Sequence, residues 1–506
     1  MESQNNLKNP QKAISDKPIA IICIALVFIF VAFMAIKPDG TLAVVSKVFD
    51  VVTSIMGVPI LWFVFIGLFL ALYIALSKHG NVKLGEGKPD FSMFSYIAMM
   101  ICAALAATAV FYSFVEWSYY YADPAFGITP YSKDAAEYSL PYAFFHWGFS
   151  VQVIFVLTAV SLCYAYYVRK VPSLRISAVC EEMMGGFRHK KKVGRLIDGL
   201  TILSIVGGMG VSLGVGVPLI TAGLAKIFGI TPSFTINVVA LLIIAAVFSI
   251  TSFIGIERGM KRLSDWTLYL GIFLIAFIFI TGPTGFIVKN FTQSVGTMLT
   301  NYVDMSLFTD PIGKSGFPEL NTIFLFTLAL NYAALMGIFI TKISKGRTIR
   351  QMILTCLFGI SLGTWIMFGI NGSFGMLEEI SGGFALSKAE DVSAGLFQLL
   401  GTMPGGLFAP IIYTVVTVGF LATSLDSASF TLAASSTKQL DSKGNPNPAF
   451  RLVWCVVLAL VPLSIMFAQA PFTAIKTVCI VLSVPFLFII IGMLYGLFRW
   501  FKEDGN

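Results

Sequence analysis

Hydroxyl side chains and one carboxylate interrupt an apolar stretch late in the chain. The segment "GFLATSLDSASFTLAASS" covers residues 419–436. Thr423 and Ser424 follow Phe420 by three and four residues, so on a helix both hydroxyls lie within one turn of the Phe420 carbonyl. Oxygen ligands at one depth of a membrane suit a hard cation such as Na⁺. Asp426 would add a negative field, whereas the alternative is a small-residue packing face with a locally hydrogen-bonded Asp426.

A second carboxylate lies in "VFYSFVEWSYYYADP", residues 110–124. Tyr112, Glu116 and Tyr119 have the spacing of one helix face. A buried acid beside phenols can hold a substrate amine, relay a proton, or fix helices through hydrogen bonds. The residues leave these three roles open.

Composition places these groups inside a polytopic membrane protein. Hydrophobic residues make up 57% of the 506 residues, charged residues only 12%, and the mean hydropathy is +0.85. A soluble domain of this size has no core large enough for so many apolar side chains. We therefore expect an all-α membrane protein.

Apolar runs of about 20 residues, enough for a helix to cross the hydrocarbon layer, recur along the chain. The twelve predicted spans are 18–36, 52–77, 93–121, 141–168, 197–227, 234–256, 266–282, 320–341, 351–370, 407–435, 452–467 and 472–500.

The positions of the positively charged residues indicate the orientation of the chain in the membrane rather than a nucleic-acid partner. Most Lys and Arg residues fall in the tails and in alternate gaps between spans, including "FRHKKK" at residues 187–192. Cytoplasmic loops collect such residues, so both termini are expected in the cytoplasm. The 187–192 cluster is read as a headgroup contact, with a regulatory role as the alternative.

Enzyme chemistry is not supported by the reactive residues. The seven cysteines show no CxxC spacing, and the three histidines form no metal-ligand pair. No nucleophile and base occur in a recognisable arrangement. A channel is also disfavoured, because different spans carry different polar features instead of one repeated pore signature.

Three further segments carry structural expectations. "GGMGVSLGVGVP", residues 207–218, lies within a span, where a helix either breaks to line a cavity or packs closely on another helix. Residues 286–303 have apolar side chains at helical spacing and predict an amphipathic helix on the outer surface. Residues 386–402 predict a short outer helix.

Five motifs in order resemble those of the betaine/choline/carnitine transporter family. They are "FHWG" (145–148), "SLGVGVPLI" (212–220), "TDPIGKSGFP" (309–318), "ISKGRTIRQ" (343–351) and "TSLDSAS" (423–429). Within the family, the second and third motifs are most similar to the carnitine-transporter branch.

The resemblance implies a LeuT-like fold of two inverted five-helix repeats preceded by two extra helices, with substrate at the repeat interface. It also implies a homotrimer in the bacterial inner membrane. The expected divisions are a tail (1–17), two peripheral helices (18–77), the first repeat (93–282), an outer helix and linker (283–319), the second repeat (320–500) and a short tail (501–506).

The substrate site implied by the resemblance departs from the family pattern. The family's aromatic cage for a quaternary ammonium would fall on Phe326, Leu328, Ala329 and Tyr332 of the eighth span, together with Tyr119 and Trp147. Two cage positions are therefore aliphatic. Gln152 replaces a family tryptophan, and Asn331 adds an amide. With Glu116 nearby, the predicted substrate is smaller, less cationic, or held more by hydrogen bonds.

The ion site implied by the resemblance follows the sodium-coupled members. Its ligands would be Phe420, Thr423 and Ser424 with backbone carbonyls near Cys102 and Leu105. Sodium-independent carnitine exchangers place an arginine where this chain has Thr267.

A second sodium site would need threonines where this chain has Ile205 and Met209. The prediction is therefore a secondary transporter that imports a zwitterionic or amine-containing solute with one Na⁺ and no organic cofactor. The alternative is a sodium-independent substrate/product antiporter.

Overall fold

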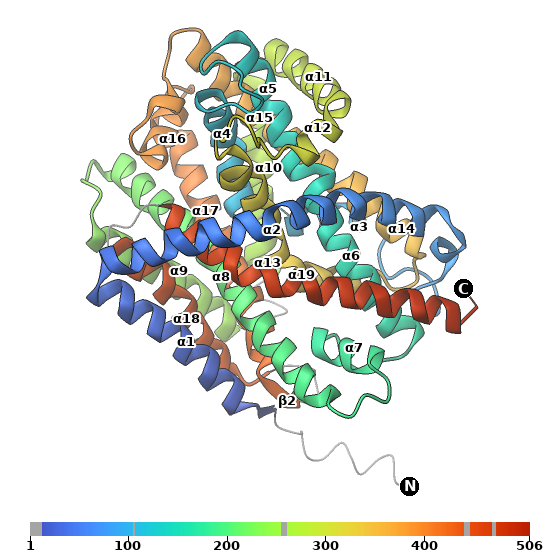
Figure 1. Cartoon of the computed structure of the whole chain (residues 1–506). Helices are drawn as coiled ribbons and strands as arrows, with labels where there is room; N and C mark the ends of the chain where they lie inside the picture. The colour runs from blue at the N-terminus through green and yellow to red at the C-terminus, as the bar shows by residue number, and fades with distance from the viewer. Residues whose placement is uncertain (1–12, 105–106, 255–260, 440–445, 468–471, 506) are drawn as a thin grey trace.

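The computed structural model describes residues 13–104, 107–254, 261–439, 446–467 and 472–505 of the chain, and it consists almost entirely of helices (Figure 1). The prediction of an all-α membrane protein is confirmed. Within the described residues, nine helices are long and apolar enough to cross a membrane.

Every predicted span corresponds to a helix or a series of helical segments. In chain order these are α1 (Lys17–Ile36), α2 (Pro38–Leu76), α3 and α4 (Met93–Ala104, Ala107–Ala122), α5, η3, α6 and η4 (Lys133–Phe145, His146–Ser150, Val151–Cys163, Tyr164–Val168), α8 (Lys190–Phe228), α9 (Phe234–Ile254), α10 (Lys261–Thr281), η6 and α13 (Pro318–Ile323, Phe324–Ile343), α14, η7 and α15 (Ile349–Leu354, Thr355–Ile360, Ser361–Ile380), α17 (Phe408–Ser435), α18 (Pro448–Phe467) and α19 (Phe472–Glu503).

Shorter elements connect them: η2 (Lys78–Asn81), α7 (Ile176–Met183), α11 (Thr284–Thr300), α12 (Tyr302–Leu307), η8 (Leu386–Lys388), α16 (Val392–Gly401), and the strands β1 (Ile14–Ser15) and β2 (Thr437–Gln439). The strands pair antiparallel and join the N-terminal segment to the chain that follows α17. The sequence did not indicate this pairing.

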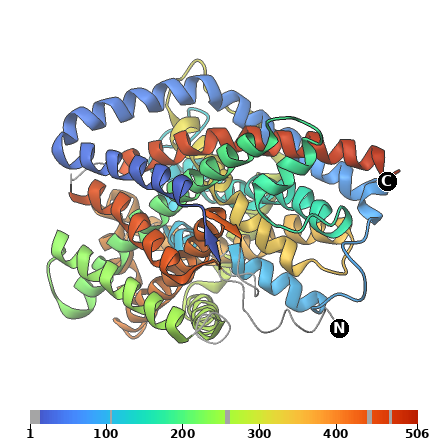
Figure 2. The ribbon, with the colours of Figure 1, turned by 90° about the horizontal axis from the view of Figure 1, so that it is seen from below.

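The largest difference from a predicted boundary is at α2. Helix α2 begins at Pro38, not near residue 52, because polar residues such as Asp39 and Asp50 continue the helix instead of forming a loop. Proline is well suited to a first helical turn, since its missing N–H has no partner there anyway. The long α2 lies beside α19 in both views (Figures 1 and 2).

The predicted amphipathic helix of residues 286–303 corresponds to α11 and the start of α12. Helix α11 buries Ile287, Ser294 and Met298, which share one face, and this helix packs against α5 and α15 (Figure 1). Its other face exposes Val288 and Leu299. The predicted short helix near residues 386–402 is present as α16.

Glycines let α8 approach its neighbours closely. Helix α8 runs without a break through the glycine-rich stretch and Pro218, so the close-packing alternative describes this segment. A Cβ atom on Gly208 would lie 3.0 Å from the Asn331 Cβ and 3.1 Å from the Tyr332 Cε2 of α13. A Cβ atom on Gly216 would lie 2.8 Å from Cδ2 and 2.9 Å from Cγ of Leu421 in α17.

Two of the sequence motifs have structural roles in loops. In "TDPIGKSGFP", hydrogen bonds from Ser315 and from the Gly313 backbone lower the pKa of the exposed Asp310 carboxyl group. In "ISKGRTIRQ", Thr348 and Gln351 form a capping box at the start of α14. Arg347 stacks on the Tyr96 ring at 4.2 Å, which ties this loop to α3.

We predict that Gly216→Val lowers stability by about 1–3 kcal/mol, because the added carbons overlap Leu421 in a packed interface. Gly296→Val is the matched control, since a Cβ on Gly296 meets nothing within 4 Å. The apparent unfolding temperature in detergent measures both variants. Equal shifts for the two would show that helix propensity, not packing, determines the cost.

Candidate functional site

The fourth span contains a kink at the "FHWG" motif. Residues His146–Ser150 form a π-helical turn in which Gly148 has φ −88° and ψ −136°, outside helical geometry. A Cβ atom on Gly148 would lie 2.9 Å from Cε2 and Cζ2 of Trp365, so only glycine fits there. Such π turns are frequent at functional sites.

At the kink, two side chains donate to the Trp147 carbonyl. The Thr364 hydroxyl donates to it at 2.9 Å and the Gln152 amide nitrogen at 3.2 Å. Because lipid offers no hydrogen bonds, a carbonyl freed within a membrane helix requires such partners. Gln152, which the sequence proposed for substrate binding, therefore also completes the kink.

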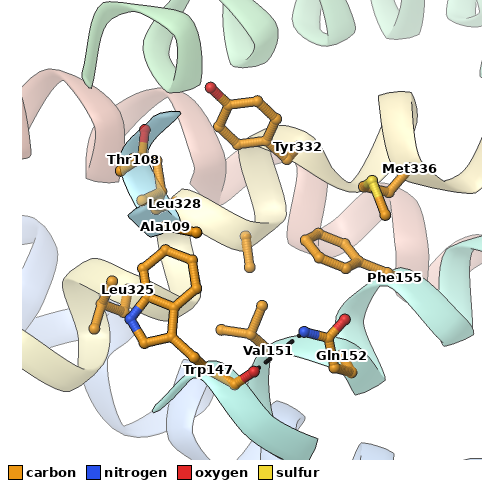
Figure 3. A pocket seen from close by; sticks show the side chains of 11 residues that line it. Thr108, Ala109, Trp147, Val151, Gln152, Phe155, Leu325, Leu328, Tyr332 and Met336 are labelled. Atoms are coloured by element: carbon orange, nitrogen blue, oxygen red, sulfur yellow. Dashed lines mark hydrogen bonds between the residues drawn. The ribbon is translucent and has the colours of Figure 1, made fainter. Parts of the chain in front are cut away.

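A buried cavity of about 60 Å³ lies beside this kink, between the fourth span, α4 and α13 (Figure 3). Five predicted substrate residues line it: Trp147, Gln152, Leu328, Ala329 and Tyr332. Six other residues complete the lining: Thr108, Ala109, Val151, Phe155, Leu325 and Met336. The sequence reasoning missed these six. Helical spacing was the available signal, since Leu325 and Met336 share a face of α13 with Leu328 and Tyr332.

Three hydroxyl groups form a chain at one side of the cavity. Ser212 Oγ lies 2.5 Å from Thr108 Oγ1 and 2.6 Å from the Tyr332 hydroxyl. The Tyr332 hydroxyl also lies 3.3 Å from the Gly208 carbonyl, to which it can donate. These hydroxyls thus hold α4, α8 and α13 together at the cavity wall.

The remaining predicted substrate residues lie away from the cavity lining. Asn331 accepts a hydrogen bond from Ser204 Oγ at 2.6 Å and donates to the Cys479 carbonyl at 2.8 Å, so it joins α8, α13 and α19. Phe326 is fully buried and packs near His146, with ring centroids 6.3 Å apart. Tyr119 packs edge-on against Tyr112.

Glu116 is the centre of a buried hydrogen-bond cluster behind the cavity. Its carboxylate accepts from the Trp147 indole N–H and from the Tyr120 hydroxyl, each at 2.5 Å. Nδ1 of His146 lies 3.1 Å from the same carboxylate, and its Nε2 lies 3.0 Å from Thr322 Oγ1. Glu116 does not line the cavity. Of the three roles left open by the sequence, this geometry favours the fixing of helices, because the carboxylate orients the Trp147 ring.

The predicted sodium ligands on α17 lie together. Thr423 Oγ1 lies 3.0 Å from the Phe420 carbonyl oxygen and 3.1 Å from that of Gly419, and Ser424 follows it, partly exposed. The helix α10 residue Thr267 contacts α17 at Gly419, where any Cβ would overlap its side chain. Cys102 lies in α3 with its side chain outside the described part of the chain, and Leu105 lies outside the described residues altogether.

Asp426 is not a free negative charge beside this cluster. Its carboxylate accepts a hydrogen bond from Arg451 of α18, and both side chains are buried. The expected negative field is therefore balanced by a guanidinium. Among the described residues, no group of three or more His, Cys, Asp or Glu side chains is placed to hold a metal ion.

The structure is that of an all-α protein whose helices are long and apolar enough to cross a membrane and surround a small, mostly apolar cavity. Residues 18–506 match the betaine/carnitine/choline family of transporters, and the chain belongs to this family. The resemblance inferred from the five motifs is confirmed. The family implies a small-molecule substrate and a multi-pass position in the membrane lipid.

Two relatives and one solved structure show how far the similarity extends. The carnitine transporter of Acinetobacter baumannii is 36% identical over 508 aligned positions, covering 100% of this chain and 91% of the relative. The uncharacterized transporter YeaV of Escherichia coli K12 is 34% identical over 438 residues, covering 86% of this chain and 91% of YeaV. A solved Na⁺-coupled sialic acid symporter covers 87% of this chain and 86% of its own, at 13% identity and a TM-score of 0.45. That structural likeness is too low to support any inference.

We predict that Glu116→Leu lowers stability by about 1–3 kcal/mol, since it leaves the buried Trp147 N–H without an acceptor. Glu116→Gln costs less, because its amide oxygen accepts from Trp147 while the Tyr120 hydroxyl turns to accept from its NH₂ group. Apparent unfolding temperatures distinguish the two variants. If Gln costs as much as Leu, the charge of Glu116 rather than its hydrogen bonding is essential.

We predict that Arg451→Met costs about 3–5 kcal/mol, because it leaves the Asp426 carboxylate buried without its guanidinium. Adding Asp426→Leu to that variant restores most of the stability, since a well-packed apolar pair replaces the ion pair. The test compares unfolding temperatures of the single and double variants. A double variant no more stable than Arg451→Met would contradict this account.

Proposed function

We propose that this chain is a secondary active transporter of the bacterial cytoplasmic membrane, which imports a small zwitterionic or amine-containing organic solute together with one Na⁺. The observation that carries the proposal is the cavity beside the Gly148 kink, where Trp147, Gln152, Leu328, Ala329 and Tyr332 meet. Both termini are proposed to lie in the cytoplasm, and the protein is proposed to form a homotrimer.

The lining of the cavity supports a substrate without strong net charge. None of the eleven described residues that line it carries a carboxylate, an ammonium or a guanidinium group. A charge carried by the solute must therefore be balanced within the solute itself or by aromatic faces such as Trp147. A relative at 36% identity is named a carnitine transporter, which supports a solute of related chemistry. The cavity of about 60 Å³ holds only a small head group.

The hydroxyl cluster of α17 supports sodium coupling. A threonine hydroxyl that donates its one proton to a carbonyl keeps oxygen lone pairs for a cation. Thr423 supplies such an oxygen beside the Phe420 carbonyl, Ser424 follows it on the helix, and Thr267 lies close to Gly419 without bringing a positive charge. Binding both ligands to one conformation couples their movement, because each favours the state that the other needs.

One observation favours the sodium-independent antiporter as a second candidate. The Thr423 hydroxyl is already close to two backbone carbonyls, those of Gly419 and Phe420, as in an ordinary helix. This pairing also satisfies the side chain without an ion. The two candidates differ in what drives uptake, so a transport assay separates them.

We predict that uptake into proteoliposomes falls at least tenfold when external sodium is replaced by potassium. The solute is chosen by a thermal-shift screen of amines, betaines, amino acids and sulfonates with and without Na⁺. Thr423→Val and Ser424→Ala should raise the sodium concentration needed for half-maximal uptake while changing substrate affinity less. Exchange that is undiminished in potassium would defeat the symport proposal and favour the antiporter.

Thr417→Val is the matched control on the same helix, because this buried hydroxyl donates to the Tyr413 carbonyl two turns away from Ser424. It should leave the sodium requirement unchanged. A control variant that weakens the sodium requirement as much as Thr423→Val would show that the effect is structural.

A further inference from the structure

Gln152 presents an unpaired acceptor at the cavity. Its side chain is 1% exposed, and it lines the cavity (Figure 3). The amide oxygen Oε1 is buried and has no hydrogen-bond partner. A buried acceptor without a partner is costly, so such an atom in a residue that lines a binding cavity indicates a missing donor.

The orientation of this amide follows from chemistry. Oxygen and nitrogen of a glutamine are assigned from their hydrogen bonds. The Gln152 atom that faces the Trp147 carbonyl at 3.2 Å must be the NH₂ group, because a carbonyl oxygen only accepts. The Gly148 kink thus fixes the amide, and Oε1 is left as the end that needs a donor.

The other polar side chains of the lining are already paired. Thr108 and Tyr332 share hydrogen bonds with Ser212, and Tyr332 also reaches the Gly208 carbonyl. Among the described residues that line the cavity, Gln152 is the one with a buried, unpaired polar atom. The remaining lining is apolar or aromatic.

We propose that Oε1 of Gln152 selects solutes whose cationic nitrogen carries at least one N–H, that is, protonated amines rather than quaternary ammonium compounds. This inference rests on the proposed function and deepens it. A protonated amine satisfies both features of the cavity at once: its charge interacts with the face of Trp147, and its N–H donates to Oε1.

A quaternary ammonium meets only one of these features. Its nitrogen is covered by carbon, so it has no donor for Oε1. When such a head group occupies the cavity, Oε1 stays without a donor, so the complex lacks this hydrogen bond and is weaker. Hydrogen bonds to charged groups contribute enough for a discrimination of about 10- to 100-fold.

The test uses two pairs of compounds that differ by one N-methyl group: N,N-dimethylglycine against glycine betaine, and N,N-dimethylethanolamine against choline. Dissociation constants are measured by calorimetry on the purified full-length protein in sodium-containing buffer. The compound with the N–H in each pair should bind the wild-type protein at least tenfold more tightly. Equal affinities within the pairs, or tighter binding of the quaternary compound in either pair, would overturn the proposal.

Gln152→Leu keeps much of the side-chain volume and removes both the acceptor Oε1 and the amide group that donates to the Trp147 carbonyl. The preference should fall to about twofold or less, and Gln152→Met serves if the leucine variant folds poorly. Thr364→Val is the matched control, because Thr364 donates to the same Trp147 carbonyl but does not line the cavity. It should keep the tenfold preference. A preference that survives in both Gln152 variants would overturn the proposal.

The test of Gln152 is independent of the proposal that transport is coupled to Na⁺. If sodium proves unnecessary for uptake while the N–H preference holds, the symport proposal fails and the role of Gln152 stands. If none of the four compounds binds while another solute is taken up with sodium, the role of Gln152 fails and the transport proposal stands.

Discussion

The Trp147 residue is held in one orientation by hydrogen bonds from several helices, and the cavity depends on this constraint. Its indole N–H donates to Glu116 of α4, and its carbonyl accepts from Thr364 of α15 and from Gln152. That carbonyl directly precedes the Gly148 kink, and a membrane interior requires that backbone groups at such a kink be paired. The ring can therefore present a fixed face to a ligand, at a site where flexibility would weaken a cation–π contact.

The glycines of α8 extend this constraint to the opposite wall. Gly208 lets α13 come close enough for Tyr332 to reach Ser212 and for Asn331 to join α8 to α19. A bulkier residue at that position would push α13 away and break these hydrogen bonds. Close backbone contact thus allows a small cavity with well-defined polar groups. Small residues at the interfaces of other membrane helices permit the same close approach.

The sequence predicted the helices and half of the cavity well, because long apolar runs and local spacing carry that information. The prediction was less accurate for residues at the edges of the cavity-lining face of α13. Phe326 and Asn331 each lie roughly 60° beyond the face that Leu328, Ala329 and Tyr332 define, given about 100° per residue. Which face points inward depends on neighbouring helices. The partner of Asp426 was equally hidden, since Arg451 lies 25 residues further along and on another helix.

The motifs that place the chain in its family and the residues that contact a ligand are largely different sets. Thr348, Gln351 and Asp310 build loops and helix starts, and Gly148 builds a kink. Such residues preserve the arrangement of helices and leave cavity positions free to vary. Gln152 belongs to both sets, because it lines the cavity, one end of its amide completes the kink, and the other end is a buried oxygen without a partner. A residue in this position links specificity to architecture, because replacing it removes the acceptor and one of the two side-chain donors to the Trp147 carbonyl together. Thr364 supports that carbonyl from outside the cavity lining.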